Sequence, residues 1–173
     1  MVSDQEFRDL MAGVCSPVTV VTAMEQGSPC GTTVGAFASL SLHPPMVTAA
    51  LDRRSGLLDV IRRRGVFGVN VLGRGQEGIA LRFARRGIDR FADVEWRLEH
   101  GLPRLADAPG WMACRIADLV EGGDHLLVLG TVEACASGLT APLVYAHRTF
   151  GTHSGFELRP RRPITEQIAA LAR

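Results

Sequence analysis

The chain has 173 residues, of which 46% are hydrophobic, and this length allows one domain with a substantial core. Its formal net charge of +1 gives no electrostatic reason for binding nucleic acid or an anionic membrane surface. All 19 basic residues are arginine, so neither a Schiff-base lysine nor the lysine of a phosphate-binding P-loop is available. No repeat or linker divides the sequence, so we expect a single domain over residues 1–173.

The cysteines, the histidines and the N-terminus exclude further classes of protein. Four cysteines without C-x-x-C spacing are typical of small buried side chains rather than disulfides, and the histidines do not have the spacing of a metal site. Asp4 and Glu6 stand where a signal peptide would be basic, and no apolar run approaches the roughly 18 residues of a membrane span. We therefore expect a cytoplasmic protein that binds no metal and does not enter a membrane.

The first half of the chain predicts a helix, three strand-like segments and a second helix. Ser3 and Glu6 have the spacing of a capping box, and the helix that follows has one apolar face, made by Phe7, Leu10, Met11 and Val14. β-Branched residues predict a strand at 17–24, and the hydroxyl-rich stretch GTTVGAFASLSLHPP at 31–45 has a strand pattern that ends at two prolines. Another strand is predicted at 45–52, and a helix at 55–65 that ends at a glycine.

The second half predicts mostly strands. They are expected at 66–72, 93–98, 111–120, 125–135 and 142–151, with short helices at 76–87 and from about Thr165. The turn sequence EGGD makes 111–120 and 125–135 a hairpin. Since strands outnumber helices and mostly follow each other directly, we predict a mainly β fold, an antiparallel closed or split barrel with peripheral helices.

One motif favours a different fold. The sequence VFGVNVLGRGQEGIALRF places Gly73, Gly75 and Gly78 between a strand and a helix, with Asp93 about 20 residues further on, which is the pattern of a dinucleotide-binding Rossmann fold. The next candidate strand is too polar for the centre of a parallel sheet, and the motif comes after several β segments. We therefore keep the Rossmann oxidoreductase only as a less favoured alternative.

Several segments, in order, resemble the flavin reductase family, the small reductase components of two-component flavin-dependent monooxygenases. They are PVTVVTA, GTTVGAFASLSLHPPMV, LDRRS, FGVNVL, Q followed by ALRFA, DRF, GGDH and PLVYAHRTFG, spread over residues 17–151. The resemblance implies an FMN-binding split β-barrel homodimer that binds FMN or FAD and reduces it with NADH or NADPH. The reduced flavin would then diffuse to a separate monooxygenase partner.

A flavin gives residues 31–45 a physical purpose. A flat ring must approach the backbone closely, which small side chains permit, and hydroxyls can hydrogen-bond ribityl and phosphate oxygens. The resemblance matches Thr33, Val34 and Gly35 to the flavin ring, and Ser39 and Ser41 to the ribityl and phosphate groups. The family commonly has Asn or Ser where Gly35 stands, so binding there would depend more on backbone groups.

Other expected flavin contacts come from later parts of the chain. Arg53 and Ser55 precede a helix N-terminus, where an anion is favoured, although a solvated Arg53 is the alternative. The resemblance matches Arg90 to a residue near the flavin phosphate. Asn70 is either a flavin contact or a hydrogen-bonded core amide. The remaining residues that we expect at the flavin are Asp52, Phe83, Ala84 and Phe91.

The nicotinamide side of the site rests on three residues. The resemblance makes His125 in GGDH the candidate for contact with the nicotinamide, and Tyr145 with Arg148 the candidates for holding the nucleotide phosphates. No catalytic nucleophile is expected, because the two cofactors carry the hydride-transfer chemistry. A flavin-binding protein without nicotinamide activity remains the alternative, and these three residues separate the two functions.

Overall fold

The computed structural model describes residues 2–153, so the helix predicted from about Thr165 lies outside the described residues. The helices are α1 (Asp4–Ala12), α2 (Gly56–Arg64) and α3 (Glu77–Ala84). The strands are β1 (Ser16–Pro17), β2 (Thr19–Glu25), β3 (Ser28–Val34), β4 (Phe37–Leu42), β5 (Pro45–Asp52), β6 (Val66–Val71), β7 (Trp96–Glu99), β8 (Leu102–Leu105), β9 (Gly110–Gly122), β10 (His125–Ser137), β11 (Val144–Ala146) and β12 (Thr149–Gly151).

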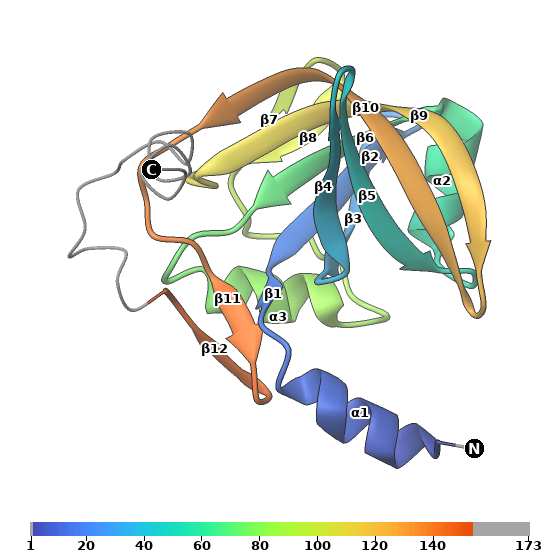
Figure 1. Cartoon of the computed structure of the whole chain (residues 1–173). Helices are drawn as coiled ribbons and strands as arrows, with labels where there is room; N and C mark the ends of the chain where they lie inside the picture. The colour runs from blue at the N-terminus through green and yellow to red at the C-terminus, as the bar shows by residue number, and fades with distance from the viewer. Residues whose placement is uncertain (1, 154–173) are drawn as a thin grey trace, which may run out of the picture.

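Seven of these strands form one antiparallel sheet in the order β3-β2-β6-β9-β10-β5-β4. The two edge strands, β3 and β4, follow each other in the chain, and β3 also contacts β5. The sheet therefore curls until its edges approach one another, as Figure 1 shows, without a ladder of hydrogen bonds joining them. The predicted mainly β split barrel with peripheral helices is confirmed.

The Rossmann alternative is wrong. β6, the strand before the glycine-rich segment, pairs antiparallel with both β2 and β9, and every strand pairing of the described chain is antiparallel. Gly73 and Gly75 lie in the connection from β6 to α3, where the side chain of Gln76 accepts a hydrogen bond from the Gly73 N–H at 2.8 Å. The glycines thus shape a tight loop before a short helix.

Two predicted strands are each divided in two. The segment 31–45 breaks at Gly35 and Ala36 into β3 and β4, and a turn at His43 and Pro44, joined by a cis peptide bond, leads into β5. The segment 142–151 breaks into β11 and β12 because His147 and Arg148 both have positive φ, at 50° and 59°, and reverse the chain in two residues. The minor strand predicted at 93–98 is shorter, β7, and pairs with β8, which the sequence pattern did not reveal.

The core has two main parts. One fills the barrel beneath α2, where Ile61, Phe67 and Val69 are fully buried, and the other packs α3 against β2 through Phe83 and Val20.

The predicted capping box of α1 is confirmed, because the Ser3 hydroxyl and the Glu6 carboxylate each accept a hydrogen bond from the other residue's backbone N–H. α1 buries none of its residues and projects from the barrel (Figure 1). Within residues 2–153, no helix has both the length and the apolar character needed to cross a membrane.

Candidate functional site

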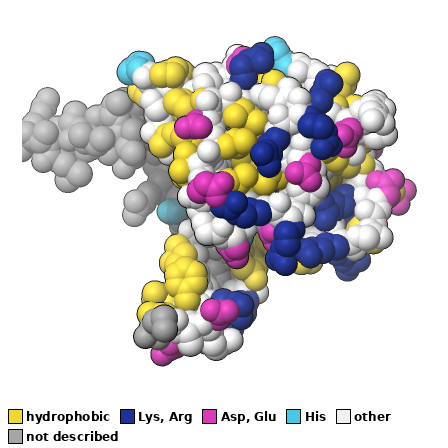
Figure 2. Space-filling view, turned by 90° about the vertical axis from the view of Figure 1, so that its right-hand side faces the viewer, with side chains coloured by type: hydrophobic (Ala, Val, Ile, Leu, Met, Phe, Trp, Pro, Cys, Tyr) yellow, Lys and Arg dark blue, Asp and Glu magenta, His cyan; other side chains and the backbone are white. Residues whose placement is uncertain are grey.

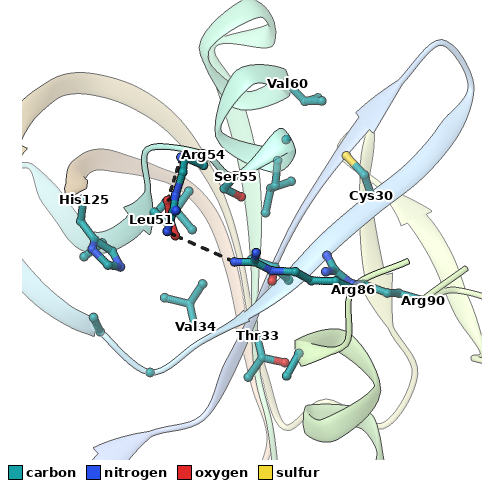
Figure 3. Close-up of a pocket in the computed structure, with 18 of the residues that line it drawn as sticks. Cys30, Thr33, Val34, Leu51, Arg54, Ser55, Val60, Arg86, Arg90 and His125 are labelled. Carbon is teal, nitrogen blue, oxygen red and sulfur yellow. Dashed lines mark hydrogen bonds and ion pairs between the residues drawn. The ribbon is translucent and has the colours of Figure 1, made fainter. Parts of the chain in front are cut away.

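A cavity of about 780 Å³ opens between β3, the end of β5, the start of α2 and the end of α3 (Figure 3). This volume is typical of small-molecule binding sites. The barrel topology brings together residues that are far apart in the sequence. Among the predicted site residues, those in the cavity wall are Thr33, Val34, Gly35, Asp52, Ser55, Ala84, Arg90 and His125.

Three arginines, Arg54, Arg86 and Arg90, line this cavity and give one part of it a positive charge. Asp52 accepts hydrogen bonds from Nε and Nη2 of Arg54, at 3.3 and 3.2 Å, and Nη2 of Arg86 lies 4.0 Å from Oδ2 of Asp52. The hydrogen bonds from Arg54 lower the pKa of Asp52 to about 2, so this carboxylate is ionised at neutral pH and keeps both guanidinium groups near the cavity.

The start of α2 adds to the attraction for an anion. Ser55 and Gly56 lie in the cavity wall, and the first N–H groups of a helix have no partners within the helix. The Ser55 side chain forms no capping hydrogen bond, which leaves its hydroxyl available to a ligand. Glu25, a second carboxylate of the wall, is paired with Arg63. Arginines beside a helix N-terminus are the arrangement that binds phosphate groups.

The threonine hydroxyls of β3 hold α3 in place. Oγ1 of Thr33 donates to the carbonyl oxygen of Ala80 at 2.6 Å, and Oγ1 of Thr32 donates to that of Phe83 at 3.4 Å. Gly31 lets the two elements approach, because a Cβ at this position would lie 2.9 Å from the Val21 carbonyl oxygen and 3.2 Å from the Phe83 ring. The hydroxyl hydrogen of Thr33 is therefore used within the protein, and the contact of Thr33 with a flavin ring stays a prediction.

Arg90 fixes the same corner of the site. Its Nη1 donates to the Gly31 carbonyl oxygen and its Nε to the Arg85 carbonyl oxygen, both at 2.7 Å. These bonds hold the guanidinium plane against the end of α3. Figure 3 shows Arg90 and Arg86 on the opposite side of the pocket from His125.

A second cavity, of about 470 Å³, adjoins the first. The two share Thr33, Gly35, Ala36 and Ala84 in their walls. Gly35 and Ala36, between β3 and β4, are exposed and carry almost no side chain, so they form a low ridge between the cavities. The second cavity is mainly apolar, and its wall includes Pro17, Val18, Leu81, Tyr145, Arg148 and Phe150.

Asn70 lies in the core and not at either cavity. Its side chain is fully buried, its Nδ2 donates to the carbonyl oxygens of Val20 and Pro103 at 3.2 and 3.4 Å, and its Oδ1 accepts from the Leu105 N–H at 2.8 Å. The amide therefore joins β2 and β6 to β8. Of the two interpretations of this residue, the structure supports the hydrogen-bonded core amide.

Arg53 also lies away from the cavity. Its Nε donates to the Gly123 carbonyl oxygen at 2.7 Å, its guanidinium pairs with Glu121, and its backbone N–H donates to the Asp124 carbonyl oxygen at 3.1 Å. The anion-binding interpretation of Arg53 is thus replaced by a structural one, in which it clamps the β9–β10 turn. The neighbouring Arg54 has the place in the cavity that was expected for Arg53.

The remaining residues predicted at the flavin also lie outside the two cavity walls. Phe83 and Phe91 are buried and pack edge to face, with ring centroids 4.9 Å apart, so they support the wall from behind. Ser39 and Ser41 lie on β4, beyond the ridge. Their contact with a flavin stays a prediction.

Tyr145 and Arg148 lie together at the second cavity. Nη2 of Arg148 donates to Oδ1 of Asp9 in α1 at 2.6 Å, and the hydrogen bonds from Gln5 and then Arg148 lower the pKa of Asp9. The Tyr145 ring packs on Phe150, with centroids 5.0 Å apart. Arg148 therefore attaches α1 to the β11–β12 turn, a role that the sequence did not reveal.

His125 is the first residue of β10 and lies opposite Asp52 of β5 in the strand register. Its ring lines the larger cavity, and its Nδ1 lies 2.7 Å from Oδ1 of Asp124. This hydrogen bond is the main cause of the lowered pKa of Asp124. The structure thus places an imidazole across the cavity from Arg86 and Arg90 and on the same side as Asp52 and Arg54.

The larger cavity is also lined by residues that were not predicted from the sequence, among them Arg54, Arg86, Ala36 and Cys30. Arg54 and Arg86 each follow another arginine, so no local pattern indicates which of the two side chains faces the site. Burial raises the pKa of the Cys30 thiol to about 11, so this thiol is neutral at physiological pH. Among the described residues, no cluster of His, Cys, Asp and Glu side chains has the geometry of a metal site.

Comparison with known proteins identifies the family of the chain. The family model described as "Flavin reductase like domain" matches residues 11–154. The chain is 40% identical over 147 residues to the reductase component of a 4-nitrophenol 4-monooxygenase/4-nitrocatechol 2-monooxygenase of Rhodococcus opacus, a match that covers 84% of this chain and 79% of that protein. It is also 40% identical over 156 residues to the NADH:riboflavin 5'-phosphate oxidoreductase of Streptomyces pristinaespiralis, covering 87% and 89% of the two chains.

A solved structure shows the same fold. The nitrilotriacetate monooxygenase component B homologue of Mycobacterium thermoresistibile superposes with a TM-score of 0.86 at 29% identity, over 92% of this chain and 91% of that one. The family match covers most of the barrel, including every cavity residue named above. A split barrel with a paired charged and apolar cavity, and with this extent of sequence identity, makes the chain a member of the flavin reductase like domain family.

Proposed function

We propose that this protein is an NADH-dependent flavin reductase that supplies reduced FMN or FAD to a partner monooxygenase. The observation that carries the proposal is the low ridge at Gly35 and Ala36, which joins a cavity lined by Arg54, Arg86 and Arg90 to an apolar cavity. A flavin has the matching form, a flat ring with a phosphate-bearing tail. Gly35 and Ala36 would hold the ring, and the arginines with Ser55 at the start of α2 would hold the phosphate.

The protein's part in the reaction is to hold two ligands in contact. Flavin and nicotinamide together supply the chemistry, a hydride transfer from C4 of the nicotinamide to N5 of the flavin. Positioning the two rings and excluding water are the contributions that the chain makes, so an acid–base dyad is not needed. His125 lies across the cavity from Arg86 and Arg90, where it is available to the nicotinamide.

The relatives support a monooxygenase partner. The Rhodococcus protein is named as a reductase component, and the Streptomyces protein as an NADH oxidoreductase that acts on riboflavin 5'-phosphate. We infer that reduced flavin leaves this protein as a diffusing product, and that the chain works as a single domain in the cytoplasm. Both cavities open to the surface, which suits release of a non-covalently bound flavin.

Mixing the purified protein with NADH and FMN or FAD in air tests the function. We expect the absorbance near 340 nm to fall much faster than with free flavin alone, because the protein aligns the two rings. A protein that binds flavin but leaves the rate of NADH oxidation unchanged would instead be the flavin-binding alternative. Comparison of NADH with NADPH in the same assay determines the nucleotide preference, for which we expect NADH.

We further propose that the protein is a homodimer. Phe7, Leu10 and Met11 of α1 are all exposed, as is Val14 just after it, and Leu40 and Leu42 are exposed on the edge strand β4. Figure 2 shows hydrophobic side chains on the lower lobe of the molecule, the part where α1 lies in Figure 1. A second copy of the chain is the usual cover for such surfaces. Light scattering at micromolar concentration should give twice the mass of the 18.6 kDa chain, and a monomer with full activity would contradict this.

A further inference from the structure

We propose that Asp124 is a positioning residue that keeps the proton of the neutral His125 ring on Nδ1, so that Nε2 offers the nicotinamide a hydrogen-bond acceptor. The inference rests on the proposed reductase activity and adds to it a rule for which group of the nucleotide is recognised. That group is a hydrogen-bond donor, and the carboxamide NH₂ of the nicotinamide is the donor next to the reacting carbon.

The two ring nitrogens of His125 have different surroundings. Nδ1 lies 2.7 Å from Oδ1 of Asp124, whose side chain is 89% exposed and outside the cavity wall. Nε2 forms no hydrogen bond with any of residues 2–153. Because the ring itself lines the cavity, Nε2 is the nitrogen that remains for a ligand.

The position of Asp124 is fixed by its neighbours. Arg53 makes three contacts with the turn. Its backbone N–H donates to the Asp124 carbonyl oxygen, its Nε donates to the Gly123 carbonyl oxygen, and its guanidinium pairs with Glu121. Three contacts from one residue thus hold the β9–β10 turn against the end of β5. On the other side, His125 faces Asp52 in the strand register, so both ends of the hydrogen-bonded pair are anchored to the barrel.

The chemistry of the pair determines the tautomer. The hydrogen bond from His125 lowers the pKa of Asp124, so this carboxylate is ionised at neutral pH and can only accept hydrogen bonds. A neutral imidazole carries one N–H, and the carboxylate requires it on Nδ1. Nε2 then presents a lone pair to the cavity. A ligand NH₂ is bound there, whereas a ligand carbonyl oxygen meets another acceptor.

A nucleotide analogue tests the direction of this hydrogen bond. Reduced 3-acetylpyridine adenine dinucleotide has a methyl group where NADH has the carboxamide NH₂, so it keeps the carbonyl but lacks the donor. With the wild-type protein we expect the KM for the analogue to exceed that for NADH by roughly 2- to 12-fold, the value of one neutral hydrogen bond. If the KM for the analogue still exceeds that for NADH in His125→Ala, the remaining difference is a property of the analogue itself. It is subtracted from the difference measured with the wild type.

Asp124→Asn is the decisive variant. An asparagine amide can donate to Nδ1, which moves the ring proton to Nε2 and removes the acceptor. The variant should raise the KM for NADH and leave the flavin affinity unchanged. The ratio of the KM for the analogue to the KM for NADH should fall to the value found in His125→Ala. In the His125→Ala background the same change should have no further effect on KM. Asp118→Asn, an exposed carboxylate on the same hairpin, is the matched control and should behave as wild type.

The outcomes separate the two proposals. A wild-type protein that does not accelerate NADH oxidation would overturn the proposed function and this inference with it. If the wild type is active and the ratio of the two KM values is the same in Asp124→Asn, only the role of Asp124 is overturned. A loss of flavin affinity equal to the rise in KM would also overturn it, since that result would mean that the turn supports the whole site and not the ring of His125.

Discussion

Asn70→Ala is expected to lower the free energy of unfolding by about 2–4 kcal/mol, while the folded protein keeps its affinity for flavin. The substitution removes the acceptor of the Leu105 N–H and a donor to the Val20 and Pro103 carbonyl oxygens, and it leaves a cavity in the core. Each buried group left without a partner costs about 1–3 kcal/mol. Urea denaturation followed by circular dichroism measures the first effect, and flavin titration of the folded protein measures the second.

Gln5→Ala is the matched control for this prediction. Gln5 also has a hydrogen-bonded amide, to Asp9 at 2.8 Å, but it is exposed on α1, so its removal should change stability by less than about 0.5 kcal/mol. A variant Asn70→Ala with normal stability and much weaker flavin binding would show instead that the amide contacts the ligand. The experiment therefore separates the two interpretations of Asn70, a flavin contact and a hydrogen-bonded core amide.

Local sequence patterns were enough to predict most of the barrel. The β-branched and apolar residues of β2, β5 and β6, and the turn between β9 and β10, predicted strands whose direct succession required antiparallel pairing. The capping box of Ser3 and Glu6 was equally local, because both of its hydrogen bonds join residues three positions apart. Interactions of this kind depend on few neighbours, so composition and spacing predict them well.

The errors arose where a side chain had a choice of partners from distant parts of the fold. Arg53 and Arg54 are adjacent and identical in type, yet one binds Glu121 and Gly123 while the other lines the cavity with Asp52. Thr33 lines both cavities, but its hydroxyl donates to the carbonyl oxygen of Ala80, 47 positions further on, a partner that the sequence pattern did not reveal. Such outcomes depend on which strands become neighbours, and a single sequence does not contain that information locally.

The break between β3 and β4 had a different cause. A run of small and hydroxyl-bearing residues fits a continuous strand, and nothing in its local pattern separates Gly35 and Ala36 from their neighbours. The chain breaks there because β3 pairs with β2 whereas β4 pairs with β5, at the opposite edge of the same sheet. The ridge between the two cavities is therefore a product of barrel closure, and it is also the surface on which we place the flavin ring.

Gly35→Val should weaken flavin binding by roughly 5- to 150-fold, the equivalent of about 1–3 kcal/mol for crowding a packed contact. The position is exposed, and a Cβ there would lie 3.7 Å from both the Pro17 carbonyl oxygen and Ser16 Cβ, an ordinary van der Waals distance. The protein should therefore fold normally, and the two added methyl groups should occupy the space above the ridge. Fluorescence titration with FMN and FAD measures the loss, and Gly35→Ala should give a smaller one.

Gly78→Ala is the matched control for the ridge. Gly78 lies inside α3, a Cβ there meets nothing within 4 Å, and alanine favours a helix over glycine by about 0.8–1.0 kcal/mol, so stability should rise and flavin affinity should not change. If Gly35→Val binds flavin as tightly as the wild type does, the ring does not cross Gly35 and Ala36, and the two cavities do not hold one ligand. If Gly35→Val weakens binding of FMN and of riboflavin by the same factor, the ridge contacts the ring, and the arginines of the larger cavity contact the phosphate independently.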